Sequence, residues 1–369
     1  MRLSRLLLAA CLAALLVAAP ASASASARSV PHGWMGVQVD GPLTAPGNPF
    51  GGEWDLMKAS GVETARVAFD WRVAQPDEGG PIAFGETDAV VVAAAARGVT
   101  VLPVVHRTPR WAGSGGAAST PRGTGPYVAF LRALVARYGP AGSLWTEQPA
   151  LPRMPIRAWQ IWNEPNLTRY WSKQPFARSY VKLLKAAHAA VKAADPGAKV
   201  ILAGLPNESW IALRKVYKAG GRKYFDAVAL HPYTGKPRNV VKLVEFARKE
   251  MRHYNDGRKP VWITELSWPA AKGKTKNTTG FETTDKGQAK RLKEGVKRLA
   301  ANRRRLRIQK VFWYTWLSRE GSPNSFDYSG LRRIRGGEEI SAPALGAFRA
   351  AARRLQGCAK AAGDASRCG

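Results

Sequence analysis

The chain is poor in cysteine and in acidic residues, and each shortage excludes some classes of protein or predicts a property of its surface. Only three of its 369 residues are cysteines, which excludes a fold held together mainly by disulfide bonds. Lysine and arginine number 57 against 26 aspartate and glutamate residues, so the formal net charge is +31 and acidic polymers will be attracted to the protein. A hydrophobic fraction of 45%, with 13 tryptophans, excludes intrinsic disorder and permits a large core.

The motifs of several enzyme classes are also missing. There is no Gly-x-Ser-x-Gly elbow, no His-Glu-x-x-His pair and no paired Cys-x-x-Cys, which removes serine hydrolases and the common zinc sites from consideration. No nucleic-acid-binding module is recognisable, so no specific nucleic-acid partner is expected.

The only long apolar run lies at the N-terminus. Arg2 and Arg5 precede an apolar stretch over 6–19, which a small-residue segment follows up to Ala27. This order is typical of a secretory signal peptide, so we predict cleavage before Arg28 and a secreted, extracellular protein. The alternative, a membrane anchor, needs an apolar run of about 18–20 residues, and this one is shorter. No membrane contact is expected once the segment 1–27 is removed.

Two cysteines remain after this segment, Cys358 and Cys368, both in the C-terminal tail 356–369. In an oxidising compartment they could close a small loop through a disulfide bond. The alternative is a pair of free thiols.

Short β-type runs alternate with longer helical stretches through residues 28–355. Strands are predicted at 34–39, 64–69, 100–105, 158–162, 199–205, 227–230, 261–265 and 309–315. Helices are predicted at 87–97, 127–138, 176–194, 240–253, 285–301 and after Pro343. Eight such units predict an α/β fold, a (β/α)8 TIM barrel forming a single catalytic domain. The alternative is an open doubly wound sheet, which loses support because no Gly-rich phosphate loop follows the first strand.

Three further segments differ from this pattern. Residues 113–125 and 271–284 are polar, and each could border a substrate cleft or be an ordinary loop. Basic residues dominate 286–310, which we interpret as a solvated helix face rather than a site for an anionic polymer.

Two glutamates end predicted strands four and seven. Glu164 lies in Ile-Trp-Asn-Glu-Pro-Asn at 161–166, and Glu265 lies in Trp-Ile-Thr-Glu-Leu-Ser-Trp at 262–268. At this edge of a parallel barrel, side chains converge on the mouth of the active site. Paired carboxylates across such a mouth are suited to glycoside hydrolysis, in which one protonates the leaving oxygen and the other attacks. Two salt-bridged rim glutamates are the structural alternative.

The two strings resemble those of clan A retaining glycoside hydrolases, most closely family 39-like enzymes, with family 5 as a near alternative. Further strings occur in the family order and cover most of the chain after residue 27: Ala-Arg-Val-Ala-Phe-Asp-Trp at 65–71, Thr-Pro-Arg-Trp-Ala at 108–112, Arg-Tyr-Gly at 137–139, Leu-His-Pro-Tyr at 230–233 and Phe-Trp-Tyr-Thr-Trp at 312–316. The basic stretch 331–337 and the tail after residue 356 lie outside the resemblance.

The resemblance implies that Glu164 is the general acid/base and Glu265 the nucleophile. Asn163 would donate to the sugar 2-hydroxyl, and Arg66 would hold the nucleophile ionised as a bidentate donor. Tyr233 would donate to Glu265.

Other candidates for substrate binding lie at strand ends. His106 could contact the sugar, and His231 could either bind substrate or pack at the top of the barrel. Aromatic rings are expected under the sugar, and we predict Trp316 at the floor of the cleavage subsite and Trp268 in an outer subsite, with ordinary core packing as the alternative for each.

The sequence therefore predicts a secreted retaining O-glycosidase that acts on a polysaccharide or oligosaccharide, with no cofactor and no metal, as a monomer. A non-catalytic glycan-binding barrel is the alternative. Because the chain is basic, the glycan could be anionic, or the charge could serve attachment to an anionic wall polymer.

Overall fold

The computed structural model describes residues 28–44, 51–116 and 118–357. The segment 1–27 and both tail cysteines lie outside these residues, so export and the disulfide stay predictions. Within the described part, no helix is long and apolar enough to cross a membrane.

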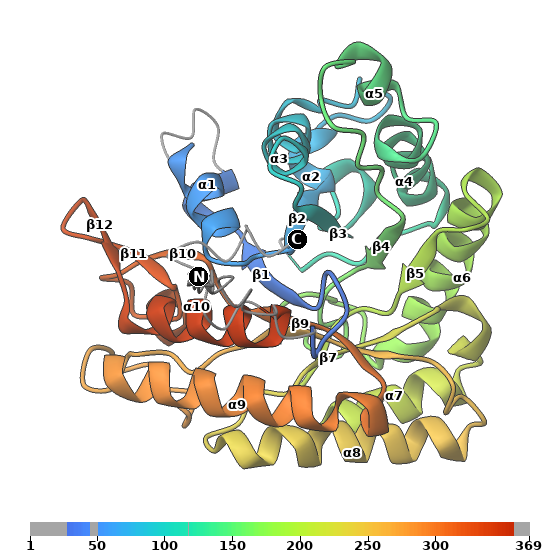
Figure 1. Ribbon diagram of the computed structural model, residues 1–369. Coiled ribbons are helices and arrows are strands. Elements are labelled where there is room, and N and C mark those ends of the chain that lie inside the picture. Colours follow the sequence, from blue (N-terminus) through green and yellow to red (C-terminus); the bar gives the residue numbers. More distant parts are fainter. Residues whose placement is uncertain (1–27, 45–50, 117, 358–369) are drawn as a thin grey trace, which may run out of the picture.

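Nine parallel strands of the described chain form one sheet, in the order β5-β4-β3-β2-β1-β9-β8-β7-β6. Strands β5 and β6 belong to one chain segment, and both contact the β7 segment through the pairs Ile201–Ala227 and Leu205–Leu230. The sheet therefore closes into a barrel, and the predicted TIM-barrel fold is confirmed (Figure 1). The strands are β1 (Met35–Val39), β2 (Thr64–Asp70), β3 (Thr100–His106), β4 (Ala158–Ile161), β5 (Lys199–Ile201), β6 (Leu205–Pro206), β7 (Val228–His231), β8 (Val261–Leu266) and β9 (Ile308–Trp313).

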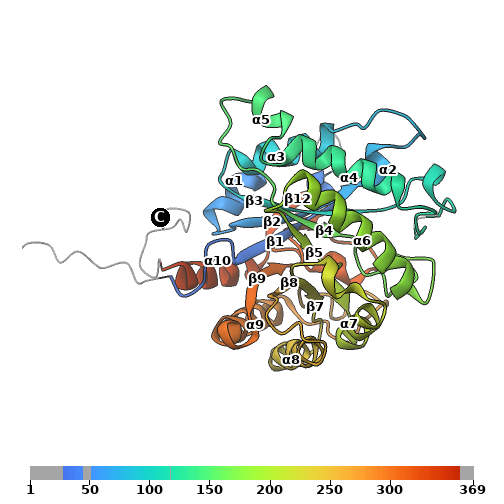
Figure 2. The same ribbon diagram turned by 90° about the vertical axis from the view of Figure 1, so that its right-hand side faces the viewer.

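Helices surround this barrel, as Figure 2 shows in a view that places the strands at the centre. Most are amphipathic and turn an apolar stripe toward the strands, as α6 does with Tyr180, Leu184 and Ala187. The helices of the described residues are α1 (Gly52–Ala59), α2 (Trp71–Ala74), α3 (Gly85–Ala95), α4 (Gly125–Tyr138), α5 (Ser143–Glu147), α6 (Phe176–Ala194), α7 (Ser209–Lys218), α8 (Pro237–His253), α9 (Asp285–Leu306) and α10 (Pro343–Gln356).

Large apolar side chains fill the inside of the barrel, so it is a packed core with a site only at its mouth. Leu102, Trp262 and Phe312 form part of this inner cluster. Phe312 packs against β1 at Gly36, where an added Cβ would lie 2.6 Å from its ring. The inner layer therefore fixes how closely β1 and β9 approach each other.

The structure differs from the predicted elements in three places. The predicted strand 199–205 is divided into β5 and β6, with Gly204 between them. Helices α1, α2, α5 and α7 were not predicted. The basic stretch 331–337 is no simple connection, because it forms part of a second, three-stranded sheet made of β10 (Leu317–Arg319), β11 (Arg332–Arg335) and β12 (Glu338–Ser341).

Ion pairs account for the basic residues of β11. Arg333 is fully buried and contacts Asp285, Glu320 and Gln288. Arg332 donates to the buried carboxylate of Glu53 on α1 at 2.9 Å. The small sheet is therefore joined to the barrel by buried charges.

Candidate active site

Glu164 follows strand β4 and is aimed into the barrel mouth by an unusual backbone. Trp162 has φ 73° and Glu164 has φ 43°, both in the left-handed region that side chains rarely adopt. The amide of Glu164 donates to the carbonyl of Gly204 at 3.1 Å, and the Trp162 indole donates to the carbonyl of Tyr170 at 2.8 Å. The turn is thus held from both sides.

Glu265 lies within β8, opposite Glu164, and is held by two donors. Arg66 of β2 donates from Nη1 to Oε1 at 2.7 Å, and Tyr233 donates to Oε2 at 2.8 Å. Arg66 also donates to Gln38, Gln160 and Asn163. Arg66 therefore makes one contact with Glu265, not the expected bidentate pair, and its other donors orient the neighbouring amides.

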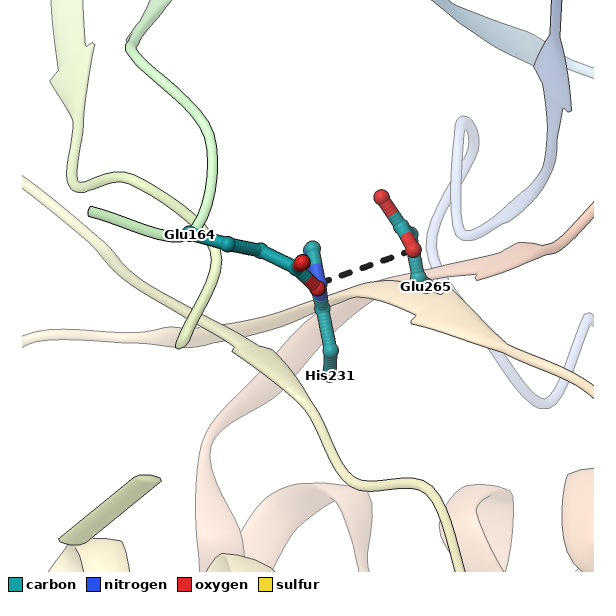
Figure 3. A group of neighbouring side chains, drawn as sticks. All are labelled: Glu164, His231 and Glu265. Atoms are coloured by element: carbon teal, nitrogen blue, oxygen red, sulfur yellow. Dashed lines mark hydrogen bonds and ion pairs between the residues drawn. The ribbon is translucent and has the colours of Figure 1, made fainter. Parts of the chain in front are cut away.

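His231 lies between the two glutamates (Figure 3). Its Nδ1 is 2.7 Å from Oε1 of Glu164 and 3.5 Å from Oε2 of Glu265. Oxygen atoms of the two carboxylates lie within 4.8 Å of each other. The side chains extend toward each other from opposite walls, as a two-carboxylate reaction requires.

Gly204 makes room for the His231 ring. A Cβ at this position would lie 1.9 Å from Nε2 of His231. Nε2 is buried without a hydrogen-bond partner among the described residues, whereas Nδ1 faces the Glu164 carboxylate, which can only accept, so Nδ1 is the nitrogen that donates to it. The ring has no exposed surface. Of the two alternatives for His231, packing at the top of the barrel is the one that agrees with this burial, and the ring contacts the glutamates.

The surroundings of Glu265 favour its ionised form. Burial alone would raise the pKa of its carboxyl, but the nearby His231 and Arg66, with hydrogen bonds from Tyr233 and Arg66, outweigh burial and lower that pKa below its ordinary value. Burial and the negative charge of Glu265 raise the pKa of Tyr233 well above its ordinary value, so its phenol stays a donor.

Asn163 is oriented by Arg66. Its Oδ1 accepts from Nη2 of Arg66 at 2.8 Å, which leaves its amide NH₂ as the free end. Asn163 lines the cavity at the barrel mouth. This orientation is the one that a donor to a sugar hydroxyl needs.

The glutamates open onto a cavity of about 390 Å³ at the barrel mouth. Its acidic groups are Asp40, Glu164 and Glu265, and its basic groups are Arg66, Arg107 and Arg169. Formal charges in the cavity therefore balance. The remaining wall residues are Gln38, Ala68, Val104, His106, Asn163, Tyr170, Pro206, Asn207, Tyr233, Thr279, Phe281, Tyr314, Asn324 and Phe326.

His106 lies in this wall as predicted, in an uncharged form. Burial, and then the charges of Arg107 and Arg66, lower the pKa of its imidazole to about 3. The ring can therefore exchange hydrogen bonds with a sugar without carrying a charge.

The predicted tryptophans are not in the cavity. Trp316 and Trp268 have no exposed surface, and their indoles donate to Glu53 and to the carbonyl of Thr234. Both predictions are wrong, since these rings are core side chains. The aromatic part of the wall consists of Tyr170 and Tyr314 with Tyr233, Phe281 and Phe326, the last three in mutual ring contact at 5.1–5.8 Å.

Loops supply several wall residues that sequence reasoning missed. Thr279 and Phe281 come from the polar segment 271–284, whereas no described residue of 113–125 lines the cavity. Arg169 contacts Glu164 Oε2 at 3.3 Å, and Arg107 pairs with Asp70. Asp40 directly follows β1, so the strand-end rule that identified the glutamates applied to it as well. Nothing in the sequence distinguished the two phenylalanines.

Among the described residues, Glu164, His231 and Glu265 form the group whose ligand atoms lie close enough to hold a metal ion. Two-carboxylate hydrolysis needs no such ion, and the expectation of a reaction without metal or cofactor stays a prediction.

A barrel with opposed strand-end carboxylates in its mouth has the architecture of a glycoside hydrolase. Comparison with known proteins assigns the same class, because residues 153–336 match the family model of the glycosyl hydrolase catalytic core. The chain thus contains a glycosyl hydrolase core.

Solved structures with a similar fold include a family 39 glycoside hydrolase and a beta-xylosidase. The fold is similar to a family 39 glycoside hydrolase from Bacteroides cellulosilyticus WH2, with a TM-score of 0.65 and 20% identity over 89% of this chain and 64% of that chain. It is also similar to a monomeric beta-xylosidase from Caulobacter crescentus CB15, with a TM-score of 0.66 and 18% identity over 88% of this chain and 69% of that one.

The curated sequences give a shorter match. A beta-xylosidase from Geobacillus stearothermophilus is 36% identical over 87 residues, which are 22% of this chain and 17% of that protein. The chain therefore spans only part of the length of these relatives. The predicted resemblance to family 39-like clan A enzymes is confirmed.

Proposed function

We propose that the protein is a retaining O-glycosidase in which Glu265 is the nucleophile and Glu164 the acid/base. The observation that carries this proposal is the separation of the carboxylates, whose oxygens lie within 4.8 Å. Retaining enzymes hold their carboxyl groups about 5–5.5 Å apart, whereas inverting enzymes need about 6.5–9.5 Å to admit a water molecule.

In the first step Glu265 attacks the anomeric carbon while Glu164 gives its proton to the leaving oxygen. Arg66 and Tyr233 keep Glu265 ionised and fix both of its oxygens. His231 donates to Oε1 of Glu164, so the proton for the leaving group is carried by Oε2, which also lies 3.3 Å from Arg169. A covalent glycosyl-enzyme intermediate results.

In the second step Glu164, now ionised, takes a proton from water, which displaces Glu265 from the sugar. Positive charge develops on the ring in both steps, and the free amide of Asn163 donates to the 2-hydroxyl as that charge grows. The aromatic wall supplies a flat apolar surface for the sugar ring.

The relatives guide the choice of substrate. Two of them are beta-xylosidases, so β-linked glycosides, xylosides first, are the substrates that we propose. We also propose that the protein acts as a monomer, in line with the monomeric relative, and that it is exported, on the strength of the N-terminal segment.

The experiment is product release from a panel of aryl β-glycosides and of neutral and acidic polysaccharides. The mature protein is compared with Glu164→Ala and Glu265→Ala, and we expect both variants to lose at least about 10³-fold in kcat. Added azide should restore cleavage in both variants but form different products. Glu164→Ala should give a β-glycosyl azide, and Glu265→Ala should give an α-glycosyl azide.

Two outcomes decide against the proposal. Undiminished cleavage by both variants would show that the glutamates are rim residues. If the intact protein binds a glycan but cleaves none of the panel, the non-catalytic binding barrel is the better description.

A further inference from the structure

A third carboxylate, Asp40, faces the cavity without a charged partner of its own. Glu164 is paired with Arg169, and Glu265 is paired with Arg66. No ion pair of the described residues includes Asp40, although Arg66 and Glu265 act on it through space. A partly buried carboxylate of this kind needs hydrogen-bond donors.

The protein supplies Asp40 with few donors. Thr315 Oγ1 lies 2.8 Å from Oδ1 of Asp40 and also 2.8 Å from the carbonyl oxygen of Gln38. A hydroxyl has one proton, and the carbonyl can only accept, so Thr315 cannot fully satisfy both. The phenol of Tyr314 also acts on Asp40 and lowers its pKa, less than Thr315 does. A carboxylate has about four acceptor positions, so some remain for a ligand in the cavity.

The position of Asp40 separates it from the reacting bond. Gln38 pairs in register with Arg66 at the level of the nucleophile. Asp40 is two residues further along the chain, directly after the end of β1, and it lines the cavity as Gln38 does, so it lies nearer the mouth. The sugar bound beside Glu265 would therefore present its ring hydroxyls to Asp40 and its anomeric carbon to Glu265.

We propose that Asp40 is a specificity-determining residue that accepts hydrogen bonds from hydroxyl groups of the sugar bound beside Glu265. This assignment rests on the proposed glycosidase function and narrows its substrate. The sugar in this subsite carries free hydroxyls and is neutral, because a uronate, sulfate or phosphate on the same ring would meet both Asp40 and Glu265. An acidic group of the glycan belongs to another subsite.

Burial supports this assignment. Removal from water, together with the negative charge of Glu265, raises the pKa of Asp40 to about 6. Sugar hydroxyls that donate to the ionised carboxylate would reverse part of that shift. The acid limb of kcat/KM should therefore contain a group that titrates near 6, and binding of the sugar should lower its pKa.

The test uses Asp40→Asn and Asp40→Ala with 4-nitrophenyl β-xyloside, β-glucoside, β-galactoside and β-glucuronide. Single-deoxy analogues of the best substrate extend this panel. For that substrate, Asp40→Ala should lower kcat/KM by about tenfold to a hundredfold, the size of a hydrogen bond to a charged group. For the deoxy analogue that lacks the contacted hydroxyl, the wild type and Asp40→Ala should differ by less than threefold. The glucuronide should gain relative to the glucoside in Asp40→Asn.

Two controls separate recognition from folding. Asp55→Asn removes an exposed carboxylate that pairs with Arg97 on the outer helices, and it should leave every rate unchanged. Asp40→Asn keeps the shape and the acceptor toward Thr315, so it gives the same comparison if Asp40→Ala does not fold. Equal losses on the parent and on all deoxy analogues would overturn the assignment and make Asp40 a support for Thr315. A wild type that cleaves no glycoside would overturn the proposed function, and this assignment with it.

Discussion

At the scale of single residues, the guanidinium of Arg66 both pairs with the Glu265 carboxylate and orients the neighbouring amide side chains. It neutralises Glu265 from Nη1 and holds Gln38, Gln160 and Asn163 with its donors. Because the side chain is only 2% exposed, solvent does not weaken these interactions. Charge and shape of the site therefore depend on the same residue.

Replacement of Arg66 by methionine should change the pH dependence in a definite direction. The positive charge lowers the pKa of Glu265 and that of Asp40, so its loss raises both. The nucleophile must be ionised, so the variant should lose activity at a higher pH than the wild type as acid is added. The acid limb of the kcat/KM profile measures this shift. Arg137→Met, which breaks an ion pair with Asp88 on the outer helices, should leave the limb in place.

Sequence reasoning located the residues that follow a strand pattern and missed those that do not. Glu164, Glu265 and Tyr233 were found because each stands near a strand end in a recognisable string. Arg66, which lies inside β2, was found through its string alone. Trp316 was misplaced because β9 ends at Trp313, so alternation along the strand no longer determines which way residue 316 points. Phe281 and Phe326 meet only through the folding of two distant loops, which no local pattern encodes.

At the scale of elements, helix α6 occupies the predicted range 176–194, because its apolar residues recur with helical period over many turns. Helix α7 was missed because, at ten residues, its apolar pattern covers few turns. The sheet formed by β10, β11 and β12 was missed for a different reason. Its middle strand has the sequence Arg-Arg-Ile-Arg. Such a sequence can form a buried strand only when carboxylates and carbonyls from distant parts of the chain accept hydrogen bonds from the arginines.

Arg333 and Arg335 of that strand allow a matched test. Both contact Glu320, but the Arg333 side chain is 1% exposed and that of Arg335 is 53% exposed. Arg333→Met should lower the free energy of unfolding by about 3–5 kcal/mol, because it leaves Asp285 and Glu320 without their buried partner. Arg335→Met should cost less than about 1 kcal/mol, as expected of an exposed ion pair. Denaturant unfolding compares the two, and equal small losses would mean that the buried network contributes little.

At the scale of the whole molecule, the size and sign of the charge were predictable from composition, but its placement was not. The cavity is balanced, with three acidic and three basic groups, so the formal charge of +31 resides outside it. Much of it lies on the outer face of α9, where Lys290, Lys293 and Lys297 are exposed. The structure therefore separates the charge of the protein from the chemistry of the site.

This separation predicts that polyanion binding and glycoside cleavage can be uncoupled. At low salt the protein should bind polygalacturonate, and the affinity should fall steeply as salt displaces the counterions. Replacing Lys290, Lys293 and Lys297 with glutamine should weaken binding several-fold and reduce its salt dependence, while kcat/KM on a neutral aryl glycoside stays unchanged.

The matched control replaces Arg178, Lys182 and Lys185, which are exposed on α6, with glutamine. Because α9 also carries exposed Lys286, Arg304 and Arg305, its neighbouring charges reinforce one another, and its triple variant should lose more affinity than that of α6. Equal losses would show that polyanions respond to net charge alone, with no preferred face.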